Sequence, residues 1–146
     1  MVGRLFNLLH LFTDGGVILS NPSPFGGTWA WCLVGDDDFL WRENSGIILP
    51  DKVNPLWKGG VLENPKVTNN HAEFYAMLQG LTQANLTLPG GRTCILWSDS
   101  KITLGRFFQH WTCTNIPEFW IIQKNEISHY LYFYGIKIFP RYVKGH

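Results

Sequence analysis

Three acidic residues of this 146-residue sequence have neighbours that suit metal or acid–base chemistry. Asp14 follows an apolar run and precedes two glycines, Glu73 lies near the start of an amphipathic segment, and Asp99 follows a second apolar run. Each residue also has an ordinary structural explanation: a turn, a capping-box partner and a helix N-cap. Their chemical interest therefore depends on whether the fold brings them together.

The pattern of apolar residues predicts the elements that position these acids. Strands are expected at 5–13, 28–34, 41–49, 93–97 and 135–143, and helices at 68–86, from 98 to about 109 and from 115 to about 132. Phe74, Met77, Leu78 and Leu81 fall at helical spacing in the first helix. Asn70 and Glu73 match a capping box at its start. Residues 50–67, with three Pro and two Gly, are expected to form a surface loop.

The order of these elements predicts an α/β domain in which the acids converge. The first three strands form an antiparallel meander, and a right-handed crossover through the first helix places the fourth strand parallel to the first. Asp14 and Asp99 then lie at the carboxyl ends of adjacent parallel strands, where open α/β sheets bind ligands. Glu73, expected in the first turn of the helix, begins near the same edge.

Three converging carboxylates imply a cation. Without one, their like charges repel, and hard divalent ions with oxygen ligands relieve that repulsion. Mg²⁺ suits a site of few carboxylates completed by water and phosphate oxygens. A site of two such ions can activate water and stabilise the leaving oxygen of a phosphodiester. The predicted geometry therefore favours phosphoryl-transfer chemistry.

Composition limits the function classes. The formal net charge of +1 excludes a generally basic surface, so phosphate binding has to come from a local patch. Aromatic residues make up 15% of the chain, including seven Trp, which suits core filling, base stacking or both. Cys32, Cys94 and Cys113 form no zinc or disulfide pattern, which favours a reducing, cytoplasmic location. Residues 1–12 are interpreted as leading into a strand rather than as a signal peptide, and residues 1–146 as one domain without a membrane span.

Four motifs, in order, resemble type 1 ribonuclease H. They are Phe12-Thr13-Asp14-Gly15-Gly16 with Asn21-Pro22 and Gly26-Gly27, then Thr68-Asn69-Asn70-His71-Ala72-Glu73, Trp97-Ser98-Asp99-Ser100, and Tyr142-Val143-Lys144-Gly145-His146. The second motif is the most specific. Residues 21–31 are also similar to ribonuclease H-like proteins of phage or environmental origin. The resemblance implies a ribonuclease H-like fold: a five-stranded mixed sheet, with a meander of strands one to three, parallel strands one, four and five, and helices on both faces.

The resemblance also implies an activity and a site. The activity is metal-dependent endonucleolytic hydrolysis of the RNA strand of an RNA–DNA hybrid, with Mg²⁺ or Mn²⁺ as cofactor, the hybrid as partner, and neither a membrane nor an obligate protein partner. The implied metal ligands are Asp14, Glu73 and Asp99. His146 would assist proton or product handling as a fourth catalytic residue. Hybrid recognition is implied near Gly15, Gly16, Asn21, Asn69, Asn70 and Ser100, where amides and exposed backbone can meet 2′-hydroxyls.

Two departures from the family keep an alternative open. The family's fourth carboxylate, an aspartate on a helix after the histidine, has no counterpart in the sequence, and no Trp- and Lys-rich helix for gripping the hybrid is apparent. A catalytically weak or inactive nucleic-acid-binding module is the alternative, although a pure binder has no need for clustered acids. A recombinase on the same fold is disfavoured because Glu73 precedes Asp99, whereas those enzymes carry their glutamate late.

Overall fold

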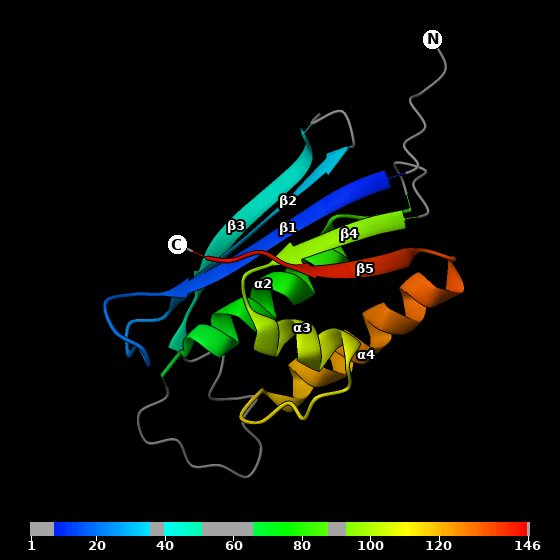
Figure 1. Ribbon diagram of the computed structural model, residues 1–146. Coiled ribbons are helices and arrows are strands. Elements are labelled where there is room, and N and C mark those ends of the chain that lie inside the picture. Colours follow the sequence, from blue (N-terminus) through cyan, green and yellow to red (C-terminus); the bar gives the residue numbers. More distant parts are fainter. Residues whose placement is uncertain (1–7, 36–39, 51–65, 88–92, 146) are drawn as a thin grey trace.

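The structure, a computed structural model, describes residues 8–35, 40–50, 66–87 and 93–145 (Figure 1). Most of the expected loop at 50–67 lies outside the described residues. The described elements, in chain order, are β1 (Leu8–Val17), β2 (Gly27–Gly35), β3 (Leu40–Ile48), α2 (Asn69–Gln83), β4 (Thr93–Ser98), α3 (Lys101–Phe108), α4 (Glu118–Phe133) and β5 (Lys137–Tyr142). Every strand and helix expected from the sequence is present. None of the described helices is long and apolar enough to cross a membrane.

The five strands form one mixed sheet in the order β3-β2-β1-β4-β5. β1, β2 and β3 make the antiparallel meander, β4 runs parallel to β1, and β5 runs parallel to β4. This arrangement confirms the fold predicted from the sequence. It also makes β1 and β4 neighbours, which is the pairing that brings Asp14 and Asp99 to one edge.

β1 is longer than the sequence suggested. We expected Asp14-Gly15-Gly16 to break the strand, but its antiparallel pairing with β2 continues from Asp14 opposite Ala30 to Val17 opposite Gly27. The glycines stay extended because β2 supplies a partner strand for them. Parallel pairing with β4 ends earlier, at Phe12 opposite Trp97. Asp14 therefore lies beyond the last residue pair between β1 and β4, where β1 is paired with β2 on one side but no longer with β4 on the other.

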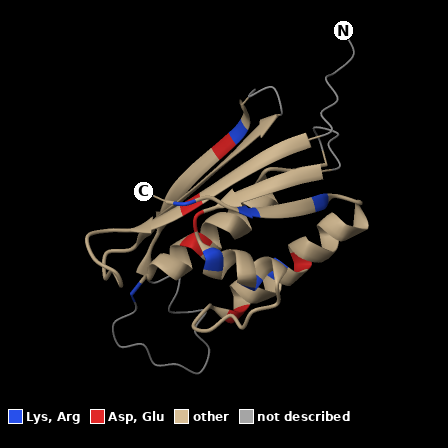
Figure 2. Cartoon of the chain, viewed as in Figure 1, with Lys and Arg blue, Asp and Glu red and all other residues tan. Residues whose placement is uncertain are grey.

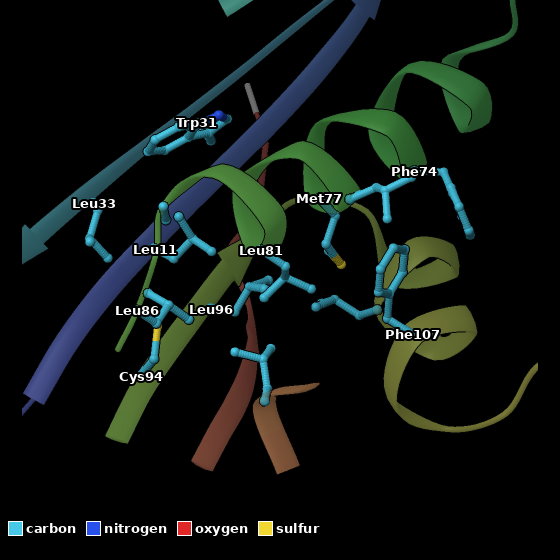
Figure 3. Packing of buried hydrophobic residues seen from close by; sticks show 14 of the residues in the cluster. Leu11, Trp31, Leu33, Phe74, Met77, Leu81, Leu86, Cys94, Leu96 and Phe107 are labelled. Carbon is cyan, nitrogen blue, oxygen red and sulfur yellow. The ribbon is translucent and has the colours of Figure 1, made fainter. Parts of the chain in front are cut away.

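A single core lies between the sheet and the helices. Alternate residues of β1 and β4 turn toward α2, and Figure 3 shows their side chains packed against those of the helix. Buried members of this core include Leu9, Leu11, Trp31, Leu33, Phe74, Met77, Leu81, Cys94, Leu96 and Phe107. Phe74, Met77, Leu78 and Leu81 are all buried, as their helical spacing predicted. Burying side chains of this size contributes on the order of 1.5–3 kcal/mol each and holds α2 against β1.

The described helices cover one face of the sheet only. α2, α3 and α4 lie together on the same side of the sheet (Figure 1). Of the β1 residues that point away from them, His10 is half-buried and Phe12 is exposed. The expectation of helices on both faces is therefore not met by the described residues. Helical spacing shows which side of each helix is apolar, but not which face of the sheet that side covers.

Candidate active site

Three carboxylates meet where β1 extends past β4. Asp14 comes from β1, Glu73 from α2 and Asp99 from the turn after β4, and their ligand oxygens all lie within 4.8 Å of one another. Figure 2 shows acidic positions gathered at this end of β4 and at the start of α2. The convergence predicted from strand order is therefore present.

The α2 helix starts in a way that leaves Glu73 free for the site. Its N-cap is Thr68, whose side chain accepts from the backbone N–H of His71 (3.1 Å), while the Nδ1 atom of His71 accepts from the backbone N–H of Thr68 (3.0 Å). The predicted capping pair of Asn70 and Glu73 is wrong, because this cap lies two residues earlier. Glu73 is consequently in the second turn, not the first, and its carboxyl group is not used for capping.

His71 also fixes the start of α2 to the segment before α4. Because its Nδ1 accepts from Thr68, its Nε2 carries the proton and donates to the carbonyl of Asn115 at 2.7 Å. Burial lowers the pKa of His71, which agrees with a neutral ring. The ring thus orients the turn of helix that precedes Glu73.

Gly15 allows β1 to approach α2 closely enough for Glu73 to reach Asp14. A Cβ atom at Gly15 would lie 2.3 Å from the carbonyl carbon and oxygen of Ala72, and 2.6 Å from the backbone nitrogen of Glu73. The Gly15 backbone N–H donates to the Glu73 carboxyl group, which also shares a hydrogen bond with Asp14. Only glycine fits here, and its backbone orients the glutamate.

The environment of Glu73 strongly opposes its ionisation. The side chain is 8% exposed, and burial, followed by the negative charges of Asp99 and Asp14, raises its pKa to about 9. Its Oε2 atom is buried without a hydrogen-bond partner. A buried polar atom without a partner is costly, and here it faces two further carboxylates. The donor set, all oxygen and all acidic, fits a hard divalent cation such as Mg²⁺ or Mn²⁺.

The C-terminal segment closes the site beside Asp99. The Val143 backbone N–H donates to the Ser98 carbonyl (2.9 Å), which extends the path of β5 past β4. Gly145 then lies so close that a Cβ atom there would be 2.8 Å from the Oδ2 atom of Asp99. His146, predicted to assist catalysis, lies outside the described residues.

Solved structures with this architecture identify the fold. RNase H1 from the halophilic archaeon Halobacterium salinarum NRC-1 matches with a TM-score of 0.62 and 20% identity, over 94% of this chain and 86% of that one. LC11-RNase H1 in complex with an RNA/DNA hybrid matches with a TM-score of 0.63 and 14% identity, over 93% and 85%. The chain has the type 1 ribonuclease H fold. An RNase H domain from Mycobacterium tuberculosis agrees (TM-score 0.63, 18% identity, 94% and 82% covered).

At these identities the likeness establishes the ribonuclease H fold alone. No protein-family model matches the chain, and no curated protein matches it either. What the site does is therefore argued from its own residues.

The residues predicted to recognise nucleic acid lie on the same segments of this ribonuclease H fold as the carboxylates: the end of β1 and the loop after it, the start of α2, and the turn after β4. Gly15 and Gly16 line a groove of about 400 Å³ that also contains Asp14. Asn21 accepts from the backbone N–H of Asn69 (3.1 Å), which ties the loop after β1 to the start of α2. Asn70 lies in the first turn of α2 but is not its cap. Ser100 follows Asp99 and is the N-cap of α3, where its side chain accepts from the backbone N–H of Thr103.

Strand β3 adds residues to the site that the sequence analysis did not single out. Glu43, Asn44 and Ser45 line a cavity of about 770 Å³ together with Asp14 and Asp99. Strand register explains their position, because Ser45 pairs with Ala30 of β2, which pairs in turn with Asp14. Once the meander was predicted, counting residues back from its turns could have found them.

Proposed function

We propose that this protein hydrolyses the RNA strand of RNA–DNA hybrids endonucleolytically, with Mg²⁺ or Mn²⁺ bound by Asp14, Glu73 and Asp99. The observation that carries the proposal is the carboxylate triad within 4.8 Å on a ribonuclease H fold, together with the partnerless buried oxygen of Glu73. A buried carboxyl group that has an unpaired oxygen and faces two other carboxylates does not stabilise the fold. A divalent cation would turn it into a satisfied ligand.

The chain's own residues prepare the site for phosphodiester cleavage. Asp14, Glu73 and Asp99 would hold the cation, which when bound supplies an activated water and stabilises the leaving oxygen. Gly15 orients Glu73 through its backbone N–H, so this ligand is fixed before metal arrives. Asp14 is exposed, so the metal-binding edge is open to a phosphate from the solvent side.

Selection of a hybrid is proposed to come from the groove beside the triad. A protein distinguishes RNA from DNA by contacts to 2′-hydroxyls, which both donate and accept hydrogen bonds. The backbone of Gly15 and Gly16 lines the groove, and the Asn21–Asn69 hydrogen bond joins two amide-bearing segments, the loop after β1 and the start of α2. Asn70 and Ser100 complete the proposed contacts. The hybrid complex of LC11-RNase H1, which has the same fold, supports a hybrid as the substrate.

His146 stays in the proposal as an assisting residue. It is the next residue after Gly145, whose backbone lies against the Asp99 carboxylate. An imidazole titrates near neutral pH and is suited to proton handling during departure of the leaving group. A His146→Ala variant that keeps metal binding but turns over more slowly would support this role.

Cleavage of an end-labelled RNA–DNA hybrid in Mg²⁺ or Mn²⁺ tests the proposal, with duplex RNA and duplex DNA of the same sequence as controls. We expect internal cuts in the RNA of the hybrid only, and loss of at least about 100-fold in rate for Asp14→Asn, since a charged metal ligand is removed. Glu126→Gln, at an exposed position of α4, is the matched control and should cleave normally. Hybrid binding without cleavage in either metal would reject the nuclease and leave a binding module.

A further inference from the structure

The sheet face that none of the described helices covers carries a group of aromatic rings that the proposed cleavage reaction does not use. His10 and Phe12 lie on β1 in the same alternating row as Asp14, and Trp97 lies on β4 two residues before Asp99. Phe12 and Trp97 are directly paired across the two strands. Phe12 is 41% exposed, and His10 and Trp97 are half-buried. We call these three residues the aromatic platform.

The rings of the platform lie nearly parallel to one another. The indole Nε1 of Trp97 donates to Nδ1 of His10 at 3.1 Å, with 21° between the ring planes and 6.3 Å between the centroids. An indole N–H and an imidazole lone pair both lie in the planes of their rings. A hydrogen bond between nearly parallel rings therefore holds them edge to edge and leaves their faces unused by each other. Phe12 lies within 10° of the Trp97 plane at a centroid distance of 6.1 Å.

The platform is continuous with the carboxylate site. The cavity of about 770 Å³ is lined by Phe12 as well as by Asp14 and Asp99, so the Phe12 end of the platform opens onto the proposed metal ligands. A chain of nucleotides leaving the carboxylates along β1 and β4 would pass directly over the rings.

Positive charge borders the platform on the β5 side. Arg141 is exposed and pairs with Trp97 in the strand register, and Lys144 lines the cavity. Flat aromatic rings next to cations are the combination that binds single-stranded nucleic acid: bases stack on the rings and phosphates meet the cations. Base stacking of this kind is also how sheet surfaces bind RNA. A protein partner would use the apolar surface, but it would leave Arg141 and Lys144, beside the proposed phosphodiester-cleaving site, without a role.

We propose that the aromatic platform stacks the bases of an unpaired nucleic-acid strand that continues from the duplex held at the carboxylates. This inference rests on the proposed function and extends it to the substrate class: hybrids that carry a single-stranded tail or junction. Arg141 and Lys144 would meet the phosphates of that tail.

Binding of a fluorescein-labelled oligothymidylate, followed by anisotropy in EDTA, tests the platform without any cleavage. We expect Phe12→Leu and Trp97→Leu each to raise the Kd about fivefold or more, because a leucine keeps apolar volume but offers no flat face. Tyr132→Leu is the matched control, since Tyr132 is an 84% exposed ring on α4, and its Kd should stay within about twofold of wild type. The salt dependence of Kd should decrease in Arg141→Gln.

Photo-crosslinking gives a readout on the unaltered chain in case a variant folds poorly. A strand containing 5-iodouracil should crosslink to peptides of β1 and β4 that contain Phe12 or Trp97. Crosslinks confined to other peptides, or equal affinity of wild type and both leucine variants, would overturn the platform. The platform would also be overturned if the protein formed a dimer that bound no single strand and that the Phe12→Leu substitution dissociated. A second copy of the chain would then occupy this face.

Together with the hybrid-cleavage assay described above, these binding experiments separate this inference from the proposed function. If the protein cleaves blunt hybrid but the leucine variants at Phe12 and Trp97 bind single strands as tightly as wild type, the nuclease proposal stands and the platform proposal is wrong. If the protein binds single strands through these rings but cleaves no hybrid, the platform stands as a binding site and the nuclease proposal is wrong.

Discussion

Replacing Glu73 by Gln should stabilise the metal-free protein at neutral pH. Burial and the charges of Asp99 and Asp14 raise the pKa of Glu73 from 4.5 to about 9, so the folded chain keeps a proton that the unfolded chain releases. A raised carboxyl pKa contributes stability that is complete below pH 4.5 and is lost as pH rises toward 9. A glutamine keeps the shape and the hydrogen bonds of the protonated acid, and it has no proton to lose.

The size of the effect follows from the two pKa values. Each pH unit between them costs about 1.4 kcal/mol, so at pH 7 the ionisable acid costs about 3 kcal/mol relative to the neutral amide. At pH 5 the difference falls below about 1 kcal/mol. Glu73→Gln should therefore be more stable than wild type by an amount that grows with pH up to about 9.

Urea unfolding in EDTA at several pH values between 5 and 8.5 measures this difference. Glu126→Gln, which changes an exposed acid of α4 in the same way, should leave the free energy of unfolding within about 0.5 kcal/mol of wild type at every pH. If Glu73→Gln is less stable than wild type at pH 8, or if the difference does not change with pH, the account of the buried carboxyl is wrong.

Two further predictions use paired variants. Gly15→Ala should destabilise the protein by about 2 kcal/mol or more and weaken metal binding, because its Cβ would collide with the backbone of Ala72, whereas Gly16→Ala meets only the Thr28 side chain at 3.5 Å and should be nearly neutral. Thermal unfolding with and without Mn²⁺ compares the two variants. Equal loss of stability in both would show that the close approach of β1 to α2 does not require glycine at position 15. Thr68→Ala should lower stability by about 1 kcal/mol, while Asn70→Ala should spare stability and slow hybrid cleavage. A stable Asn70→Ala variant with the wild-type rate would remove Asn70 from the proposed hybrid contacts.

The fold could be predicted because its strands and helices differ clearly in apolar spacing. Once three strands, a helix and a fourth strand were recognised in that order, the handedness of the crossover placed Asp14 beside Asp99. The position of Glu73 followed less exactly. Two overlapping patterns, Thr68 to His71 and Asn70 to Glu73, could both cap the helix, and the hydrogen bond between His71 and the Asn115 carbonyl favours the first.

Features that depend on contacts between distant segments could not be read from the sequence. The burial of Glu73 requires the close approach of Gly15, and the aromatic platform requires a hydrogen bond between Trp97 and His10, which are 87 positions apart. The seven Trp suited core filling, base stacking or both, and the sequence did not show which rings would lie outside the core. The open face likewise depends on which side of the sheet the helices cover.

The last prediction couples metal binding to pH. A carboxyl group must release its proton to bind a cation, and the pKa of Glu73 is about 9 in the metal-free protein. At fixed metal concentration, the affinity for Mn²⁺ should therefore rise by up to about tenfold per pH unit between pH 6 and 9. Calorimetry in two buffers of different ionisation enthalpy should show close to one proton released per site at pH 7, and none in Glu73→Gln. The carboxylates of Asp14 and Asp99 repel an ionised Glu73 but attract the cation. The same charges that oppose ionisation of Glu73 in the metal-free protein therefore favour metal binding. Affinity independent of pH, with no proton released, would mean that Glu73 is not a ligand and that Asp14 and Asp99 hold the metal without it.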